Sequence, residues 1–326
     1  MTILITGAGL IGCHTARLLS ERGQRCVLLD RHPAREAIDS IVTHPLVTCL
    51  TGDVTDMAQL EKTIEQYQVK AVIHTAALLS TAIRQDPVAG VRVNIMGTMH
   101  ILELARRHQL ARVVLASSST VCYPTFGDFR GGAFPEDFSL KSLTHRPTSI
   151  YAATKVTVEH LGLLYRDLYD VPVVALRYAA VLGAWSGPGT SIPTKVLACL
   201  AGPAREGRES VIDDPMIVWR GGEEFVDARD CALANIAALD AAQPRTGVYN
   251  ISSGRLHTFE DVSQAVRELH PALRVKMTIE PTGGFAGFPH VRHAASDISA
   301  ARSELGWTPK YSLAQSVEHY APWCHA

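Results

Sequence analysis

The sequence predicts an α/β protein built on a Rossmann-type, doubly wound parallel sheet, with a smaller C-terminal lobe that binds the substrate. Short continuous apolar runs alternate with amphipathic segments through the first half of the chain, which is typical of parallel strands buried on both faces. A glycine-rich turn directly follows the first apolar run. With 326 residues, 47% of them hydrophobic, the chain is long enough to bury such a core.

The first half is predicted to alternate strands with helices. The apolar runs predict strands over 3–6, 26–30, 46–50, 71–74 and 112–116. Helical spacing of apolar residues predicts helices over 10–22, 56–67 and 88–108. Gly23 fits the C-terminal cap of the first helix.

The second half is less regular, and this predicts the smaller lobe. We expect helices over 150–169, 230–239 and 258–269, and strands over 173–176 and 248–251. Glycine and proline cluster in 183–193, 202–215 and 281–289, which favours loops and turns there. The predicted cofactor-binding domain is 1–178, to which 225–252 returns, and the predicted substrate lobe comprises 179–224 and 253–326.

The glycine-rich turn predicts a dinucleotide site. Gly7, Gly9 and Gly12 form a G-x-G-x-x-G pattern between the first strand and the first helix. Glycines let the backbone turn tightly and approach a diphosphate closely. The start of the helix, at Leu10 and Ile11, then presents unpaired N–H groups and a positive dipole end to that anion.

The residue that ends the second predicted strand favours NAD over NADP. A carboxylate at Asp30 can accept hydrogen bonds from the ribose hydroxyls of adenosine, and it would repel a 2′-phosphate. Arg31 follows and would tolerate such a phosphate, so NADP is the less favoured cofactor.

A second motif predicts the chemistry. Tyr151 and Lys155 lie four residues apart, on one face of a predicted helix. A free phenol has a pKa of about 10, which a neighbouring ammonium can lower. Tyr151 can then exchange a proton with the substrate oxygen, at the carbon that exchanges a hydride.

Serines at the end of the fifth predicted strand supply possible partners for Tyr151. Polar residues there point into the ligand crevice of a parallel sheet. Ser117 is accordingly a candidate cofactor contact, and a hydroxyl of this run can position the substrate oxygen.

Together these motifs resemble the extended short-chain dehydrogenase/reductase family, which includes NAD-dependent epimerases and dehydratases of nucleotide sugars. The resemblance covers almost the whole chain through the segments 52–56, 74–77, 93–98, 225–230 and 305–309. Counted back from Tyr123, the family's catalytic Ser or Thr falls at Ser119. The resemblance also implies that the cofactor contacts include Asp53, Val54, Thr75, Ala76, Ala77, Asn94, Tyr151, Lys155 and Tyr178.

Several departures from the family pattern concern the substrate. The glycine loop is one residue shorter than usual, and Ala180 replaces an Asn that commonly contacts a nucleotide sugar. Glu223 replaces an Arg that faces the substrate diphosphate, and it would repel one. Thr120 and Val121 replace the acidic pair of the dehydratases, so water elimination is not expected.

These departures lead to three hypotheses. The first is an NAD-dependent dehydrogenase or ketoreductase acting on a small alcohol or ketone that is not a nucleotide sugar. The second is a nucleotide-sugar epimerase with a diphosphate site formed by another route, for which the candidate cations are Lys195, Arg205, Arg208 and Arg292. The third is a non-catalytic NAD-binding regulator, which the presence of Ser119, Tyr151 and Lys155 together argues against.

Composition narrows the remaining possibilities. With 31 basic and 32 acidic residues, the chain has no basic excess for nucleic acid or an anionic membrane. Scattered cysteines and histidines favour no metal site, and the cysteines indicate a reducing, cytoplasmic setting. We expect no signal peptide and no membrane span. By analogy with the family, we expect a homodimer formed through 88–108 and 150–169.

Overall fold

The computed structural model describes residues 1–138, 140–188 and 191–320. Parts of the predicted substrate lobe, residues 189–190 and 321–326, lie outside the described residues. Within the described ranges, no helix combines the length and apolar character that a membrane crossing requires.

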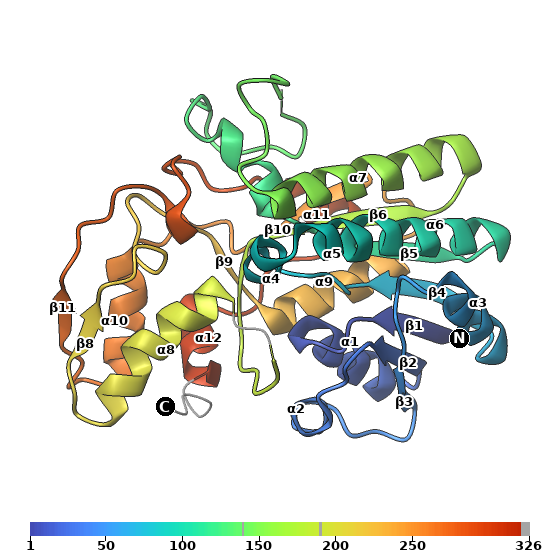
Figure 1. Cartoon of the computed structure of the whole chain (residues 1–326), viewed down its shortest axis with the longest axis horizontal. Coiled ribbons are helices and arrows are strands. Elements are labelled where there is room, and N and C mark those ends of the chain that lie inside the picture. Colours follow the sequence, from blue (N-terminus) through green and yellow to red (C-terminus); the bar gives the residue numbers. More distant parts are fainter. Residues whose placement is uncertain (139, 189–190, 321–326) are drawn as a thin grey trace.

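A parallel sheet forms the centre of the molecule (Figure 1). Within the described residues it has seven strands, in the order β10-β6-β5-β4-β1-β2-β3. The strands are β1 (Thr2–Thr6), β2 (Arg25–Asp30), β3 (Val47–Thr51), β4 (Val69–His74), β5 (Arg112–Ser118), β6 (Val173–Tyr178) and β10 (Val248–Ile251). The order reverses at β1, whose neighbours are β2 and β4, so ligands are expected at the carboxyl ends of these strands. The predicted fold class is confirmed.

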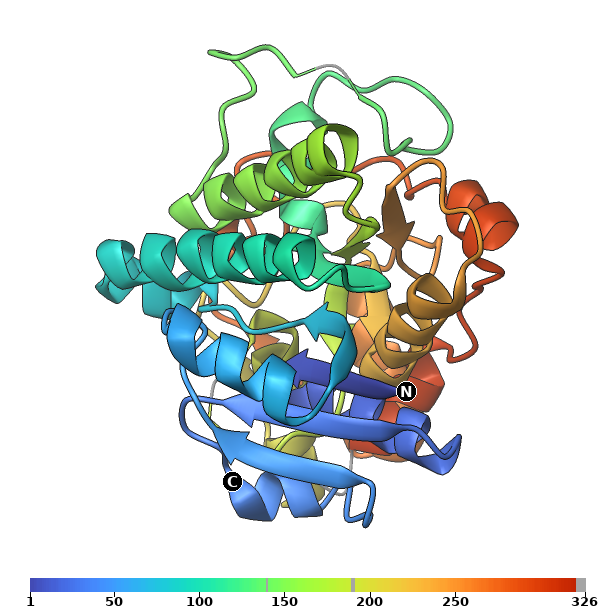
Figure 2. The ribbon, with the colours of Figure 1, turned by 90° about the vertical axis from the view of Figure 1, so that its right-hand side faces the viewer.

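Helices cover both faces of the sheet. On one face lie α1 (Leu10–Glu21), α2 (Arg35–Asp39), α9 (Ala228–Asp240) and α11 (Ser299–Leu305). On the other lie α3 (Met57–Gln66), α6 (Gly97–Arg107) and α7 (Ile150–Tyr169), and Figure 2 shows α6 and α7 side by side. Ile3 and Ile5 of β1 pack on the α1 side, whereas Leu4 between them packs on the α6 side. This alternation buries both faces of each central strand, and it explains the continuous apolar runs.

The helix predicted over 88–108 is interrupted by a π turn. The chain forms α4 (Ser80–Gln85) and α5 (Pro87–Val91), then a π segment (Arg92–Met96), and only then α6. The side chain of Asn94 is buried in the π segment, where its amide bonds the backbone of Leu78 and the hydroxyl of Thr154. The π segment therefore holds the side chain of Asn94 against α7. Such π turns are frequent at functional sites.

A smaller lobe packs around its own apolar cluster. It contains α8 (Ile192–Arg205), α10 (Phe259–Leu269), α12 (Leu313–Tyr320) and the short pair β8 (Ser210–Ile212) and β11 (Val275–Met277). Two further strands, β7 (Ala180–Leu182) and β9 (Phe225–Asp227), pair with each other between this lobe and the main sheet. The domain boundaries predicted from the sequence stay a prediction.

The loop predicted over 202–215 begins too early, because α8 continues through Gly202 and Pro203. Val196, Leu197, Leu200, Ala201 and Ala204 recur at helical spacing and are buried in the lobe cluster. That apolar face outweighs the local preference of glycine and proline for a turn.

Two helical glycines give a matched test of the packing. An added Cβ at Gly162 of α7 would lie 2.9 Å from Cδ1 of Leu115 and 3.0 Å from Cγ1 of Val173, whereas one at Gly202 would meet nothing within 4 Å. We expect Gly162→Ala to lower the free energy of unfolding, because overpacking costs about 1–3 kcal/mol. Gly202→Ala should change it less, because the gain of about 0.5–1 kcal/mol from helix propensity is opposed by Pro203, whose ring disfavours a Cβ on the helical residue before it. Urea unfolding of both variants checks this, and a Gly162→Ala variant at least as stable as Gly202→Ala would contradict it.

Candidate active site

The glycine-rich turn has the backbone geometry that a bound diphosphate requires. Gly7 has a positive φ of 91°, and its N–H donates to the carbonyl of Leu29 over 2.8 Å. A Cβ on Gly12 would lie 2.0 Å from the carbonyl oxygen of Gly7, so only glycine fits there. A Cβ on Gly9 would meet no atom within 4 Å, so this backbone faces open space. The shorter loop thus keeps a cradle for a ligand.

The start of α1 completes this cradle. The helix begins at Leu10 with Gly9 as its N-cap, and no side chain caps it. The first N–H groups of a helix have no intrahelical partner, so those of Leu10, Ile11 and Gly12 are placed to bind an anion. Leu10 and Ile11 are half-buried beside the turn. These residues fit the diphosphate of a dinucleotide.

Asp30 fixes the glycine turn to the end of β2. Its Oδ2 accepts a hydrogen bond from the N–H of Ala8 over 2.9 Å, and its Oδ1 accepts one from the N–H of His32 over 2.8 Å. A carboxylate has further lone pairs for ribose hydroxyls. Nη1 of the neighbouring Arg31 lies 3.9 Å from Oδ2 of Asp53, so its charge is partly directed at that carboxylate.

The cofactor contacts that the resemblance implies after β3 and β4 are each held in place by neighbouring residues. The side chain of Asp53 accepts two hydrogen bonds from Thr55, and the adjacent Val54 is buried against Gly97. Thr75, at the end of β4, donates to the carbonyl of Thr6 over 2.8 Å. The half-buried segment 75–77 therefore lies directly beside the glycine turn.

Tyr151 and Lys155 lie on α7 next to the end of β5. The hydroxyl of Ser149 caps the helix by accepting from the N–H of Ala152 over 3.1 Å. Nζ of Lys155 donates to the carbonyl of Ala116 over 2.7 Å and lies 5.7 Å from the centre of the Tyr151 ring. The pair is therefore placed by the first turns of α7.

Burial controls the protonation of both groups. It raises the pKa of Tyr151 to about 12, although a hydrogen bond with Ser118 acts in the opposite direction. Burial also lowers the pKa of Lys155 to about 8, and the negative charge of Glu159 opposes that shift. The sequence predicts that the pKa of the phenol is lowered by Lys155, but in this structure the pKa is raised, and burial is the main cause.

The structure gives three neighbouring serines different surroundings. Ser118, at the end of β5, lies beside Tyr151 and opposes the rise that burial causes in the pKa of that phenol, and its own hydroxyl oxygen accepts hydrogen bonds from Thr120. Ser119 is buried in the short turn that follows β5, and its catalytic role stays a prediction. Ser117 donates to Glu159 over 2.5 Å.

Two predicted cofactor contacts have their side chains directed elsewhere. The hydroxyl of Ser117 is buried against Glu159 on α7. The hydroxyl of Tyr178 is buried as well, and it donates to Asn235 of α9 over 2.6 Å. Each hydroxyl is therefore bonded within the protein, and a cofactor contact of these two residues stays a prediction. Nothing in the local spacing of the sequence reveals these partners.

A buried ion pair beside the site was not predicted. Arg177 of β6 donates to Glu159 of α7 through Nε over 2.8 Å and through Nη2 over 2.7 Å. Its Nη1 also bonds the carbonyl of Glu136 over 2.7 Å. Glu159 lies one helical turn after Lys155, so the pair joins the face of α7 that carries Lys155 to β6 and to the loop at Glu136. The i, i+4 spacing places Glu159 on the face of α7 that carries Lys155, but no local signal in the sequence indicates Arg177 as its partner.

A second buried charge cluster occupies the position where the family carries its diphosphate-binding Arg. Glu223, Glu224 and Arg292 are each at most 3% exposed. Arg292 donates to Glu223 over 3.0 Å and also bonds Glu224, while Tyr123 donates to Glu223 over 2.8 Å. Burial raises the pKa of Glu223, and Arg292 opposes this. Arg292 is buried and paired with both carboxylates, so its guanidinium is not available to bind a substrate diphosphate.

The other candidate cations lie on or after α8. Lys195 is exposed on that helix, Arg205 lies in its last turn, and Arg208 is paired with Glu206 at the surface. Among the described residues, no group of three or more His, Cys, Asp or Glu side chains is arranged to hold a metal ion.

Comparison with known proteins gives a consistent set of relatives. Residues 3–252 match the NAD dependent epimerase/dehydratase family. The chain is 28% identical to dTDP-L-rhamnose 4-epimerase of Burkholderia thailandensis, over 98% of this chain and 94% of the relative. Among solved structures it is similar to a GalE-like L-threonine dehydrogenase from Cupriavidus necator in its holo form (25% identity, 99% of both chains, TM-score 0.81). It is also similar to UDP-glucose 4-epimerase of Thermus thermophilus in complex with NAD (27% identity, 98% of both chains, TM-score 0.76).

Two glycines of the turn separate ligand binding from folding. Gly9→Ala places a methyl group in the open space of the cradle, so we expect the affinity for NAD to fall roughly tenfold or more without loss of stability. Gly12→Ala forces the turn apart and should lower the melting temperature as well. Calorimetric titration with NAD and thermal unfolding measure the two effects. Unchanged NAD affinity in Gly9→Ala would place the dinucleotide elsewhere.

Proposed function

Because the chain belongs to the NAD-dependent epimerase/dehydratase family, we propose that it moves a hydride between NAD and a secondary alcohol carbon of its substrate. One observation carries this proposal. Tyr151 lies beside the hydroxyl of Ser118 with Lys155 one helical turn away, at the sheet edge where the glycine turn opens. This is the arrangement that proton exchange at an alcohol oxygen needs.

The glycine turn and its neighbours hold the cofactor. The N–H groups at the start of α1 bind the diphosphate, and Asp30 accepts hydrogen bonds from the ribose hydroxyls. Asp53 and Val54 lie on the adenine side, and the segment 75–77 lies along the cofactor. NAD supplies the group that accepts and returns the hydride.

Ser118 and Tyr151 hold the substrate oxygen. The Tyr151 hydroxyl takes the alcohol proton when the carbon is oxidised, and it returns a proton when the ketone is reduced. A buried phenol with a pKa of about 12 carries its proton at neutral pH, so it is ready for the reduction step. In its charged form Lys155 stabilises the phenolate that forms in the opposite direction. Ser119, in the short turn directly after Ser118, is the other candidate for the hydroxyl that holds this oxygen.

We propose the epimerase form of this reaction first, in which one sugar carbon is oxidised and then reduced from its other face. The similarity to dTDP-L-rhamnose 4-epimerase and to UDP-glucose 4-epimerase over nearly the whole chain supports this form better than the dehydrogenase form that the sequence favours. The diphosphate of a nucleotide-sugar substrate must then bind elsewhere, because Glu223 stands where the family carries its diphosphate-binding Arg.

A specific observation keeps the dehydrogenase form as the second candidate. The cluster of Glu223, Glu224 and Arg292 offers no free cation, and its formal net charge is negative. A substrate without a diphosphate is compatible with that position. The similarity to an L-threonine dehydrogenase supports the same form.

We also propose a cytoplasmic homodimer. Exposed apolar side chains lie on α5 and α7, among them Val88, Leu164 and Leu168, and paired helices of two protomers would cover them. The cysteines in the described part of the chain are free, which suits a reducing compartment.

Two tyrosines of α7 test the mechanism. Tyr151→Phe should lower kcat/KM by roughly 10²- to 10⁴-fold for the compound that the wild-type protein converts, because proton exchange is lost. Its affinity for NAD should stay within about twofold, as expected when one neutral hydroxyl is removed. Tyr165→Phe is the matched control, since that hydroxyl lies at the far end of the helix beside Glu103. Full turnover in Tyr151→Phe would refute the mechanism.

The fate of the cofactor separates the two forms. An epimerase reuses its NAD within each turnover, whereas a dehydrogenase must release it. For the epimerase form we expect near-stoichiometric NAD in protein purified without added cofactor, and slow exchange against labelled NAD. Denaturation followed by quantification of the released NAD measures this. A freely exchanging site would establish the dehydrogenase form instead.

A further inference from the structure

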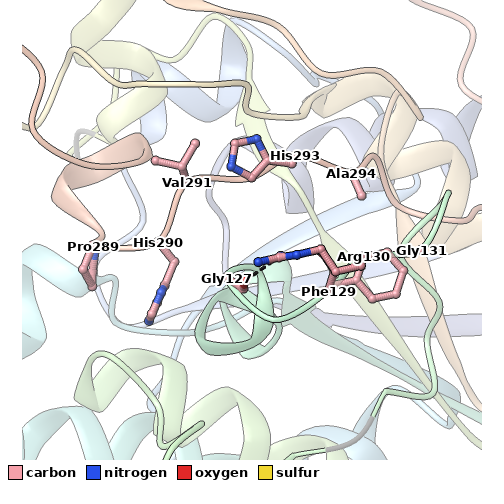
Figure 3. A pocket seen from close by; sticks show the side chains of 9 residues that line it. All are labelled: Gly127, Phe129, Arg130, Gly131, Pro289, His290, Val291, His293 and Ala294. Carbon is pink, nitrogen blue, oxygen red and sulfur yellow. Dashed lines mark hydrogen bonds between the residues drawn. The ribbon is translucent and has the colours of Figure 1, made fainter.

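A surface hollow of about 550 Å³ lies between two segments that are far apart in the sequence (Figure 3). One wall is the loop 127–131, and the other is the segment 289–294. Figure 3 shows the side chains of Arg130, His290 and His293 gathered around this space. The two walls approach each other at Gly127 and His290: a Cβ on Gly127 would lie 3.3 Å from Nδ1 of His290.

The hollow is lined by basic side chains and by no acidic one. Among the described residues Arg130 has no carboxylate partner, and its Nη1 bonds only the carbonyls of Gly127 and Phe129, over 2.6 and 3.1 Å. Asp128 is the acidic residue nearest in sequence, but its Oδ2 is bonded by Lys141 and His145 outside the hollow. A guanidinium without a carboxylate partner, beside two imidazoles, attracts anions.

The arginine inside the second wall, unlike the basic side chains that line the hollow, is buried and paired with carboxylates. Arg292 lies between His290 and His293 in the sequence, yet it points inward and is neutralised by Glu223 and Glu224. Arg292 therefore does not line the hollow, whereas the flanking His290 and His293 do.

The hollow is joined to the catalytic loop. The ring of Tyr123 packs edge-on against Phe288, with 4.6 Å between the ring centres, and Phe288 directly precedes the second wall. Tyr123 follows Ser118 and Ser119 on the short turns after β5, and the first wall begins four residues later. Both walls are therefore fixed to the segment that carries the hydroxyl beside Tyr151.

We propose that this hollow binds an oxyanion of the substrate, a phosphate or a carboxylate, with Arg130 as its main ligand and His290 and His293 as further hydrogen-bond donors. The inference rests on the proposed function, since the anion belongs to the molecule whose alcohol reaches Tyr151. In the epimerase form the anion is the diphosphate of a nucleotide sugar. In the dehydrogenase form it is the carboxylate of a hydroxy acid.

Matched pairs of probes test this proposal on the full chain saturated with NAD. UDP is compared with uridine, which lacks the diphosphate, and D-gluconate with D-glucitol, in which an alcohol replaces the carboxylate. Calorimetric titration gives the dissociation constants for the wild-type protein, for Arg130→Gln and for Arg146→Gln. Arg146 is the control, because it is exposed, does not line the hollow and bonds only the carbonyl of Leu143 among the described residues.

We expect the charged member of one pair to bind more tightly than its neutral partner, and Arg130→Gln to weaken it roughly 10- to 100-fold while Arg146→Gln does not. Preference for UDP identifies a diphosphate, and preference for D-gluconate identifies a carboxylate. Equal binding of the charged probe by Arg130→Gln and the wild type, or no preference in either pair, overturns the proposal. Binding is measured without turnover, so a failure of the Tyr151 mechanism leaves this result unaffected.

Discussion

The buried ion pair between Glu159 and Arg177 is the interaction on which the rest of the site depends. It joins α7 to β6, and through Ser117 it also joins α7 to β5. Removing one partner of a buried pair typically costs about 3–5 kcal/mol, because the other charge is left without compensation. Tyr151 and Lys155 lie on the same face of α7, so the position of the phenol relative to the strand ends follows from this pair.

The sequence predicts the parts of the fold that rest on local patterns. Continuous apolar runs predict the parallel strands, because every central strand is buried on both faces. The glycine turn and the Tyr151–Lys155 pair are likewise local in sequence. The π turn at Asn94 is not predictable in this way, because its partners Leu78 and Thr154 come from other elements. The helix through Gly202 is missed because lobe packing overrides local propensity.

The roles of charged residues near the substrate depend on partners that the sequence does not reveal. Read alone, Glu223 would repel a diphosphate and Arg292 would attract one. In the structure the two residues are paired and buried, so neither charge acts on a ligand by itself. Ser118 and Ser119 are equivalent in local sequence, whereas in the structure Ser118 ends β5 and Ser119 begins the short turn that follows. Residue type therefore predicts the kind of chemistry here, while tertiary contacts decide which residue performs it.

The return of β10 to the sheet has a consequence for synthesis on the ribosome. β10 pairs with β6, yet it is translated roughly 70 residues later, which corresponds to several seconds at 5–20 residues per second. During that interval the outer edge of β6, whose residues are all apolar or buried in the finished protein, has no partner strand. An unpaired edge of this kind is a template for intermolecular pairing. The nascent chain is thus most exposed to aggregation after β6 emerges and before β10 arrives.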